Sequence, residues 1–345
     1  MKKGLQNTIK YILSFGVAGV LVWLVARQIE WKAFVEGLKS TRWVWMIGYV
    51  AAAVLALVFR AQRWKQLLKP LMPRIRYGRC WDANNIGNLG SLVLPGSCEP
   101  IRAGIITSKN IPFQTVFGTM IMERAWDFIY IFLTFVIALT IRWETFGGFV
   151  EENIFGPVLG GGTLWWILGG IIAISAAGIW AVYHFRDKNK ALGQIADIID
   201  GMLRGLGSFR KMKNKLPFMI HTTMIWVMYM FMAFFCLKAI PELSHLDLAD
   251  ALFLSALGNV ASVVPVPGGI GAYHYLLMVC ISSLYGMSDE TGLLFAMLNH
   301  EGHAVLILAL GIWSYVMRIL VLKNKDIREI REEKRASQTA QPRQP

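Results

Sequence analysis

Long apolar runs without charge constrain this chain more than any other feature of its sequence. Leu164–Tyr183 and Leu216–Leu237 contain no Asp, Glu, Lys or Arg. About 20 apolar helical residues cross the hydrocarbon core of a bilayer, where only helices and closed barrels satisfy their own backbone. Six runs are candidates for full spans: Tyr11–Ala26, Trp43–Phe59, Phe117–Ile141, Leu164–Tyr183, Leu216–Leu237 and Leu293–Met317. The sequence therefore predicts an all-α polytopic membrane protein.

The composition supports a membrane protein and narrows its partners. Of the 345 residues, 55% are hydrophobic and 17% are charged, and the formal net charge is +13. A soluble domain usually has nearer a quarter of its residues charged. The basic residues gather between the apolar runs, so we expect them to orient the helices and contact anionic membrane lipids, not nucleic acid. The four cysteines form no C-x-x-C pair, which predicts neither a disulfide framework nor a structural zinc site.

Two shorter apolar segments, Asn84–Ile106 and Leu252–Leu284, are interrupted by Gly and Pro. Basic segments follow the second, fourth and last apolar runs, which places them and both termini in the cytoplasm of a bacterial-type cytoplasmic membrane. The acidic loops around Glu144 and Asp247 then face outside. This scheme requires each broken segment to enter and leave on one side, the first from the cytoplasm and the second from outside. We expect two re-entrant hairpins, or equivalent pairs of short crossings.

The two broken segments share a sequence pattern. Gly87–Val93 reads GNLGSLV and Gly258–Val264 reads GNVASVV, and each precedes a Pro-Gly pair and then a span with an ionisable cluster. Because the two halves have opposite topology, the pattern predicts an inverted repeat, about 43–141 and about 216–318, of the kind that forms transport sites. A chance match between two apolar segments is the alternative.

One predicted span contains three charged residues. Glu123 and Asp127 lie four residues apart on one helical face, and Arg124 follows Glu123 directly. Charges within a membrane span are unfavourable and point to function. The alternative is a structural network of ion pairs with Arg102 or Arg60.

The breaks and the nearby arginines offer sites for an anion. A helix that restarts after Pro95-Gly96 has free N–H groups and a positive dipole end at its first turn. Arg60 and Arg63 of FRAQRW are either a cytoplasmic anchor beside an aromatic belt residue or a phosphate clamp. The predicted substrate-binding residues, all charged, polar or glycine, are Arg60, Arg63, Asn88, Glu99, Arg102, Glu123, Arg124, Asp127, Asn259, Gly268, Gly269, Tyr273, His274, Asn299 and Glu301.

The motif His300-Glu301-Gly302-His303 does not match a zinc-protease site. That pattern has two His residues four apart with Glu between them, whereas these are three apart. We predict no metal and no cofactor, and expect Asn299, His300, Glu301 and His303 to face a cavity, with proton relay as an alternative. No nucleophile elbow, P-loop or dinucleotide motif occurs, so we expect no enzyme and assign no catalytic residue.

The sequence predicts one membrane domain, 1–322, and a charged cytoplasmic tail, 323–345, that is disordered at its end. Within the domain, residues 191–209 have apolar side chains at helical spacing. This spacing suits a cytoplasmic helix that lies on the membrane surface.

With FRAQRW, GNLGSLVLPGSCEPIRA, MERAWD and VPVPGGIGAYH in this order, the chain resembles the lysylphosphatidylglycerol synthase transmembrane family, also called flippase-like domain proteins. The resemblance covers about Lys10 to Lys323. In multi-domain relatives it implies that this region moves a lipid across the membrane while a separate soluble domain transfers the aminoacyl group. We expect no transferase fold after Lys323, and so no synthase activity.

We therefore expect a lipid transporter or flippase for an anionic phospholipid or a polyprenyl-phosphate-linked lipid. One alternative is a membrane accessory or binding subunit for a separate glycosyl- or aminoacyltransferase. Another is an intramembrane transferase that uses Glu123 or His300 as its base. The sequence predicts no oligomeric state.

Overall fold

The computed structural model describes residues 31–94, 96–108, 111–151, 177–187, 189–261 and 271–339. Every named element among these residues is helical, and their only strand-like pairing is an isolated bridge between Ser108 and Ile111. The predicted all-α class is confirmed for this part of the chain.

Within the described residues, four helices are long and apolar enough to cross a bilayer. They are α3 (Val44–Leu68), α6 (Phe113–Ile141), α11 (Leu216–Ala239) and the stretch of α14 (Asp289–Thr339) up to Leu320. Three of them contain a predicted span in full, and α3 contains all of Trp43–Phe59 except Trp43. The predicted span Tyr11–Ala26 lies outside the described residues, as does most of Leu164–Tyr183. Helix α3 continues beyond Phe59 because Arg, Gln, Lys and Leu in its last turns are strong helix formers.

The first broken segment forms a helical hairpin. Its arms are α4 (Tyr77–Val93) and α5 (Cys98–Ile106). Gly96, in the turn between them, has a φ of 77°, which favours glycine. A Cβ at Gly87 would lie only 2.6 Å from Cγ of Arg102. This glycine lets the two arms approach closely enough for Arg102 to lie against α4.

The second broken segment forms a similar hairpin. Its arms are α12 (Leu248–Ala261) and α13 (Ala272–Tyr285). A Cβ at Gly258 would lie 2.6 Å from the ring of Tyr273. Each hairpin therefore packs a large side chain of its second arm against a glycine of its first arm.

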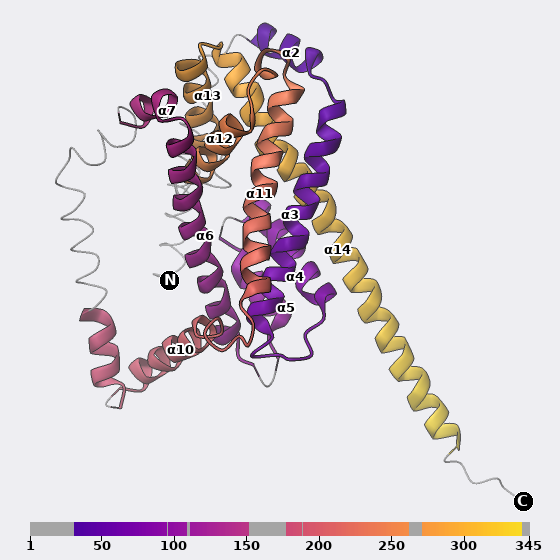
Figure 1. The fold of residues 1–345 in the computed structure, drawn as a ribbon. Coiled ribbons are helices and arrows are strands. Elements are labelled where there is room, and N and C mark those ends of the chain that lie inside the picture. The colour runs from indigo at the N-terminus through magenta and orange to yellow at the C-terminus, as the bar shows by residue number, and fades with distance from the viewer. Residues whose placement is uncertain are drawn as a thin grey trace, which may run out of the picture.

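The two hairpins lie at opposite ends of the helical bundle (Figure 1). The α4–α5 hairpin begins and ends near the end of α3 and the start of α6, where Arg79 donates a 3.0 Å hydrogen bond to the Ile105 carbonyl. The α12–α13 hairpin begins and ends near the end of α11 and the start of α14. Within the described residues, the start of the first arm and the end of the second arm of each hairpin thus lie at the same end of the bundle.

The base of the second hairpin is joined to α6 by ion pairs. Arg142, which follows α6, pairs with Asp247 and lies 3.1 Å from the buried Asp250. The Tyr285 hydroxyl at the end of α13 donates a 3.0 Å hydrogen bond to the same Asp250 carboxylate. Three elements therefore meet at one buried carboxylate.

Each hairpin has its own apolar core. The second hairpin, α12 and α13, shares one core with side chains of α3, α11 and α14. In this core Phe146 stacks on Phe253 at a centroid distance of 3.9 Å. A separate core around Trp64, Ile106 and Met120 surrounds the first hairpin. Short peripheral helices are α2 (Trp31–Ser40), α7 (Trp143–Val150) and η2 (Pro241–Leu243).

Helix α10 (Lys190–Leu206) crosses the start of α6, where the sequence predicts a surface helix at 191–209. Gly118 of α6 faces the Met202 carbonyl, and Gly205 of α10 faces the Thr115 carbonyl. Ile195 and Leu203 remain exposed. An apolar exposed face on a helix at the end of the bundle suits contact with a membrane surface.

Helix α14 runs far beyond its apolar part. Its backbone stays helical to Thr339 and projects away from the bundle (Figure 1). The sequence predicts disorder at the end of 323–345, but 323–339 is helical and only the last six residues lie outside the described part. Lys, Arg, Glu and Ala, which dominate this stretch, favour helix over coil.

Candidate functional site

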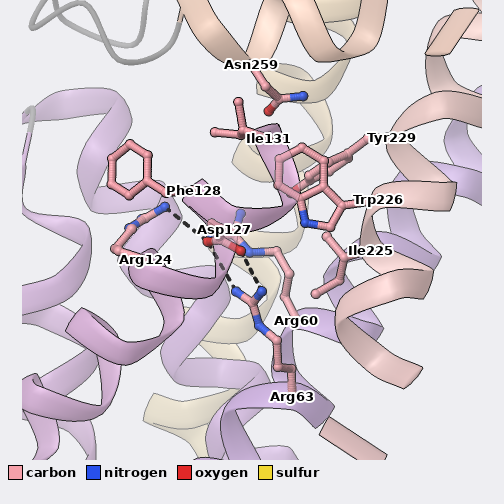
Figure 2. A pocket seen from close by; sticks show the side chains of 10 residues that line it. All are labelled: Arg60, Arg63, Arg124, Asp127, Phe128, Ile131, Ile225, Trp226, Tyr229 and Asn259. Carbon is pink, nitrogen blue, oxygen red and sulfur yellow. Dashed lines mark hydrogen bonds and ion pairs between the residues drawn. The ribbon is translucent and has the colours of Figure 1, made fainter. Parts of the chain in front are cut away.

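A cavity of about 510 Å³ lies among α3, α6, α11 and the end of α12 (Figure 2). We call it the central cavity. It is lined by Arg60, Arg63, Arg124, Asp127, Phe128, Ile131, Ile225, Trp226, Tyr229 and Asn259. Charged groups form one wall and aromatic and aliphatic side chains form another, so the cavity is amphipathic.

Arg63 links two carboxylates of α6 at the wall of the cavity. Its Nη1 lies 2.5 Å and its Nη2 3.3 Å from the two oxygens of Asp127. Its Nε lies 3.4 Å from Glu123. Because the Arg63 side chain is only 1% exposed, these ion pairs lie in a low-dielectric interior where a broken pair is strongly destabilising.

Arg102 lies behind this wall and does not line the cavity. Its Nη2 is 2.7 Å from Glu123, and its guanidinium stacks 4.2 Å from the centre of the Trp64 ring. Trp64 is fully buried and donates a 2.9 Å hydrogen bond to Thr119. Since it is buried inside the bundle, Trp64 is not an aromatic belt residue at the membrane interface. It packs against Arg102 of the first hairpin instead.

Arg124 forms the rim of the cavity. It pairs with Glu99 at the start of α5 and lies 3.7 Å from Asp127. Its side chain is 48% exposed, so this pair is far weaker than the buried ones. A rim arginine held by a weak pair can exchange its partner for an incoming anion.

Arg60 is the charged residue of the cavity that has no ion pair. No carboxylate of the described residues lies within 4.0 Å of its guanidinium, and none is joined to it in Figure 2. Around the cavity and behind it, four arginines face three carboxylates. The arginines are Arg60, Arg63, Arg102 and Arg124, and the carboxylates are Glu99, Glu123 and Asp127. The group therefore has one positive charge in excess, and Arg60 lines the cavity with no carboxylate in contact among the described residues.

The spacing on each helix explains this geometry. Arg60 and Arg63 are one turn apart on α3, and Arg124, Asp127 and Ile131 follow one stripe of α6. The stripe of α6 therefore presents two charges and then apolar groups to the same space. Asn259 reaches the cavity from the inner end of α12, where the backbone leaves its helix.

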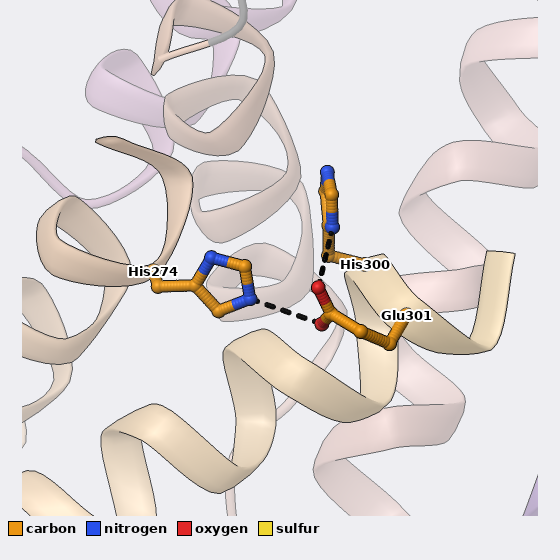
Figure 3. Close-up of side chains that lie close together, drawn as sticks. All are labelled: His274, His300 and Glu301. Carbon is orange, nitrogen blue, oxygen red and sulfur yellow. Dashed lines mark hydrogen bonds and ion pairs between the residues drawn. The ribbon is translucent and has the colours of Figure 1, made fainter. Parts of the chain in front are cut away.

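A second polar cluster lies at the inner end of the second hairpin (Figure 3). It consists of Tyr273, His274, Asn299, His300 and Glu301. Nε2 of His274 and Nδ1 of His300 each lie 3.0 Å from a different oxygen of Glu301. The Asn299 amide donates a 2.7 Å hydrogen bond to the Tyr273 hydroxyl. The cluster thus ties α13 to α14.

The donor atoms of His274, His300 and Glu301 all lie within 4.8 Å of one another, as in many metal sites. However, the Gly271 N–H lies 3.4 Å from Nδ1 of His274 and donates to it. The proton of a neutral His274 is then on Nε2, which faces Glu301. In this tautomer His274 donates a hydrogen bond to Glu301, and a metal ion at Nε2 would have to displace that proton.

The structure brings the predicted site residues together in two groups. Lining the central cavity are Arg60, Arg63, Arg124, Asp127 and Asn259. Next to it lie Asn88, which accepts a hydrogen bond from the Cys98 thiol, together with Glu99, Arg102 and Glu123. The second polar cluster holds Tyr273, His274, Asn299 and Glu301 and does not line this cavity. Gly268 and Gly269 lie outside the described residues.

The apolar wall of the cavity was not predicted from the sequence. Ile225, Trp226 and Tyr229 belong to α11, whose residues are apolar on all sides. An evenly apolar helix gives no signal of which face lines a cavity. Phe128 and Ile131 could have been found, since they continue the helical stripe of Arg124 and Asp127.

One family model, described as the lysylphosphatidylglycerol synthase TM region, matches residues 11–311. The matched stretch includes every residue that lines the central cavity and all of the second polar cluster. No curated protein and no solved structure matches the chain.

Proposed function

The chain belongs to the lysylphosphatidylglycerol synthase TM region family, and from this premise we propose that its central cavity binds the headgroup of an anionic lipid and that the protein moves this lipid across the membrane. The observation that supports the proposal is Arg60, a cation without an ion pair that lines an amphipathic cavity. A lipid phosphodiester carries one negative charge, which matches the one unpaired positive charge.

The chemistry of the lining suits a lipid. Guanidinium groups bind phosphate oxygens through paired hydrogen bonds, and Arg60 and Arg124 are the two that can do so without breaking a buried pair. Tyr229 and Asn259 offer further hydrogen bonds to the polar part of a headgroup. Phe128 and Trp226 provide an apolar wall for the start of an acyl or polyprenyl chain. A volume of about 510 Å³ lies within the usual range for small-ligand sites.

We further propose that the two hairpins are re-entrant halves of an inverted repeat that moves around this cavity. In the first half, Arg102 of the second arm pairs with Glu123 of the next long helix. In the second half, His274 of the second arm pairs with Glu301 of the next long helix. The glycine contacts of Gly87 and Gly258 are likewise alike. Such broken elements at the middle of a membrane are typical of transporters with inverted repeats.

We place the base of the first hairpin, α10 and both termini in the cytoplasm of a bacterial-type cytoplasmic membrane. The support is the charge of the loops at that end of the bundle, which are rich in Lys and Arg. The base of the second hairpin, with Asp247 and Asp250, then faces outside.

A transport assay in liposomes tests the proposed function. Purified protein would be reconstituted with fluorescent phosphatidylglycerol, a fluorescent polyprenyl phosphate or fluorescent phosphatidylcholine, and movement between leaflets would be followed by dithionite quenching. We expect movement of at least one anionic lipid, its loss in Arg60→Gln and its retention in the matched variant Arg210→Gln. The proposal would be contradicted if labelled lipid moved as fast in liposomes without protein as in those with wild type. It would also be contradicted if lipid moved equally fast with wild type and with Arg60→Gln.

A second candidate function is that of an accessory subunit for a separate glycosyl- or aminoacyltransferase. The observation that favours it is the charged extension of α14, which projects from the bundle to Thr339 (Figure 1). Affinity purification of the full chain and of a chain ending after Leu320 separates the two functions. A transferase that co-purifies only with the full chain supports the accessory role, and transport by the isolated chain argues against it.

A further inference from the structure

A second cavity, of about 590 Å³, lies at the base of the first hairpin. We call it the basal cavity. It is formed by the loop between α3 and α4, the start of α4, and Ser108 and Ile111, which lie between α5 and α6. Its lining residues are Leu71, Met72, Pro73, Arg74, Ile75, Arg76, Arg79, Ser108 and Ile111. None of the described residues lines both this cavity and the central cavity.

Among the described residues, the lining of the basal cavity is positive and contains no acidic side chain. Arg74 and Arg76 are exposed, and neither forms an ion pair with any residue in the described ranges. Arg79 donates hydrogen bonds of 3.0 and 3.3 Å to the carbonyls of Ile105 and Ile106, which end α5. Arg79 is therefore fixed across the base of the hairpin, while the other two guanidinium groups are available to a ligand.

The backbone beside these arginines adds hydrogen-bond donors. Arg76 is the N-cap of α4, and no side chain caps the helix. The amides of Tyr77, Gly78 and Arg79 have no acceptor within the helix, as in any first turn. A Cβ at Gly78 would have no heavy atom within 4 Å, so the space beside this turn is open.

We propose that the basal cavity binds a phosphate group. The two available guanidinium groups, Arg74 and Arg76, and the positive charge of the fixed Arg79 beside them form an anion site, and phosphate matches the paired donors of a guanidinium. The phosphate can belong to a lipid headgroup, since Leu71, Met72 and Ile111 place apolar surface beside the arginines, or to a soluble phosphate. The inference does not depend on the function proposed for the central cavity.

Phosphate in this position would affect the first hairpin as a whole. It would join the loop before α4 to Ser108, which follows α5. The start of α4 and the end of α5 would then be held together at the base of the hairpin. The start of α4 and the end of α5 form this base. The opposite ends of the same two helices contain Asn88 and Glu99, which lie next to the central cavity. Occupancy of the basal cavity thus stabilises one position of the hairpin relative to α6.

Hydrogen exchange of the first turn of α4 tests the proposal. The full chain would be held in dodecyl maltoside, which has no phosphate, and either phosphatidylglycerol or inorganic phosphate would be added. We expect the amides of Tyr77, Gly78 and Arg79 to exchange at least about tenfold more slowly with one of the two probes, because phosphate oxygens accept their hydrogen bonds. Slowing by phosphatidylglycerol alone identifies a lipid, and slowing by inorganic phosphate identifies a soluble ligand.

Matched variants make the outcome decisive. Arg74→Gln/Arg76→Gln should abolish the slowing, and Arg74→Lys/Arg76→Lys should retain part of it. Arg204→Gln/Arg210→Gln, which removes two exposed arginines elsewhere, and Arg60→Gln should both leave it unchanged. Exchange in the middle of α3 and α11 reports that each variant is folded. Absence of slowing with both probes, or slowing that persists in Arg74→Gln/Arg76→Gln, overturns the proposal, as does its loss in Arg60→Gln.

Discussion

Arg60 and Arg102 show how two arginines near one site can have opposite roles. Arg102 is 3% exposed and pairs with Glu123 at 2.7 Å. Arg60 lines the central cavity and has no ion pair within the described part of the chain. Removal of Arg102 leaves a buried carboxylate short of a partner, whereas removal of Arg60 breaks no pair. The first residue supports the fold, and the second is available to a ligand.

This contrast predicts different effects on stability. Arg102→Gln should reduce the free energy of unfolding by about 3–5 kcal/mol, the usual effect of breaking a buried pair. Arg60→Gln should change it by less than about 1 kcal/mol. Unfolding in detergent, followed by tryptophan fluorescence, measures both. Equal destabilisation by the two substitutions would mean that Arg60 has a structural partner.

Asp247, outside the membrane helices, predicts a dependence of stability on pH. Burial pushes the pKa of the Asp247 carboxyl up, but the amides of Asp250 and Ala249 and the Arg142 guanidinium outweigh it and hold the pKa below its ordinary value of 3.8. Because the pKa is lower in the folded state, the ionised carboxylate contributes to the free energy of unfolding above about pH 4. This contribution is lost as the pH falls through the folded-state pKa.

We therefore expect Asp247→Asn to be less stable than wild type at neutral pH, by less than about 1 kcal/mol because the carboxyl is 54% exposed. Asparagine can still cap α12, so only the charge is removed. Thermal unfolding at neutral pH and at about pH 3 measures the difference. A difference that grows on acidification would contradict the pKa direction.

At the residue scale, the sequence indicated which charges matter but not how they pair. The spacing of Glu123 and Asp127 placed both on one face of a span. Their partner Arg63 is 64 residues from Asp127, and its choice depends on how α3 and α6 are set against each other. The periodicity of residues within one helix does not predict how two helices are aligned against each other. The pairing of His274 with Glu301 was hidden for the same reason.

At the scale of elements, the long helices could be predicted because hydropathy over about 20 residues is a strong signal. The hairpins could be predicted from Gly and Pro within apolar segments. Contacts that depend on small residues could not, since Gly118 and Gly205 look like ordinary glycines in sequence. In the structure they bring α10 against the backbone of α6.

The contact between α10 and α6 predicts the effect of a single methyl group. In Gly118→Ala, the Cβ would overlap the Met202 carbonyl, a backbone group that cannot rotate away. We expect α10 to leave α6 and become more sensitive to trypsin, with a lower melting temperature. Gly104→Ala is the matched control, because its Cβ has open space within a helix. Equal trypsin sensitivity in the two variants would show that α10 does not depend on this contact.

At the scale of the whole molecule, the structure places the two hairpins at opposite ends of one bundle (Figure 1). From loop charges and a short repeated pattern, the sequence predicted two re-entrant hairpins in an inverted repeat, and the re-entry and the repeat stay predictions. The sequence could not predict that residues of α3, α6 and α11 form most of the lining of the central cavity. Only the packing of the helices determines which of their faces surround a cavity.

The proposed topology predicts which loops share a side of the membrane. Single cysteines at Arg74 and Lys211 should react with an impermeant maleimide from one side, and those at His245 and Ser288 from the other. All four positions are exposed, and the native cysteines are buried. Labelling in intact cells and in inverted vesicles distinguishes the sides. Opposite labelling of Arg74→Cys and Lys211→Cys would exclude a first hairpin that starts and finishes on one side.

The central claim is that Arg60 gives the central cavity its affinity for an anionic lipid, and native mass spectrometry of lipid-bound protein tests it most directly. All chains would carry Arg74→Gln/Arg76→Gln, so that the basal cavity does not contribute. We expect the parent and its Arg210→Gln variant to retain phosphatidylglycerol, and the Arg60→Gln variant to retain it at least about tenfold less, a loss of about 1.4 kcal/mol. Equal retention by Arg60→Gln and Arg210→Gln would contradict the claim.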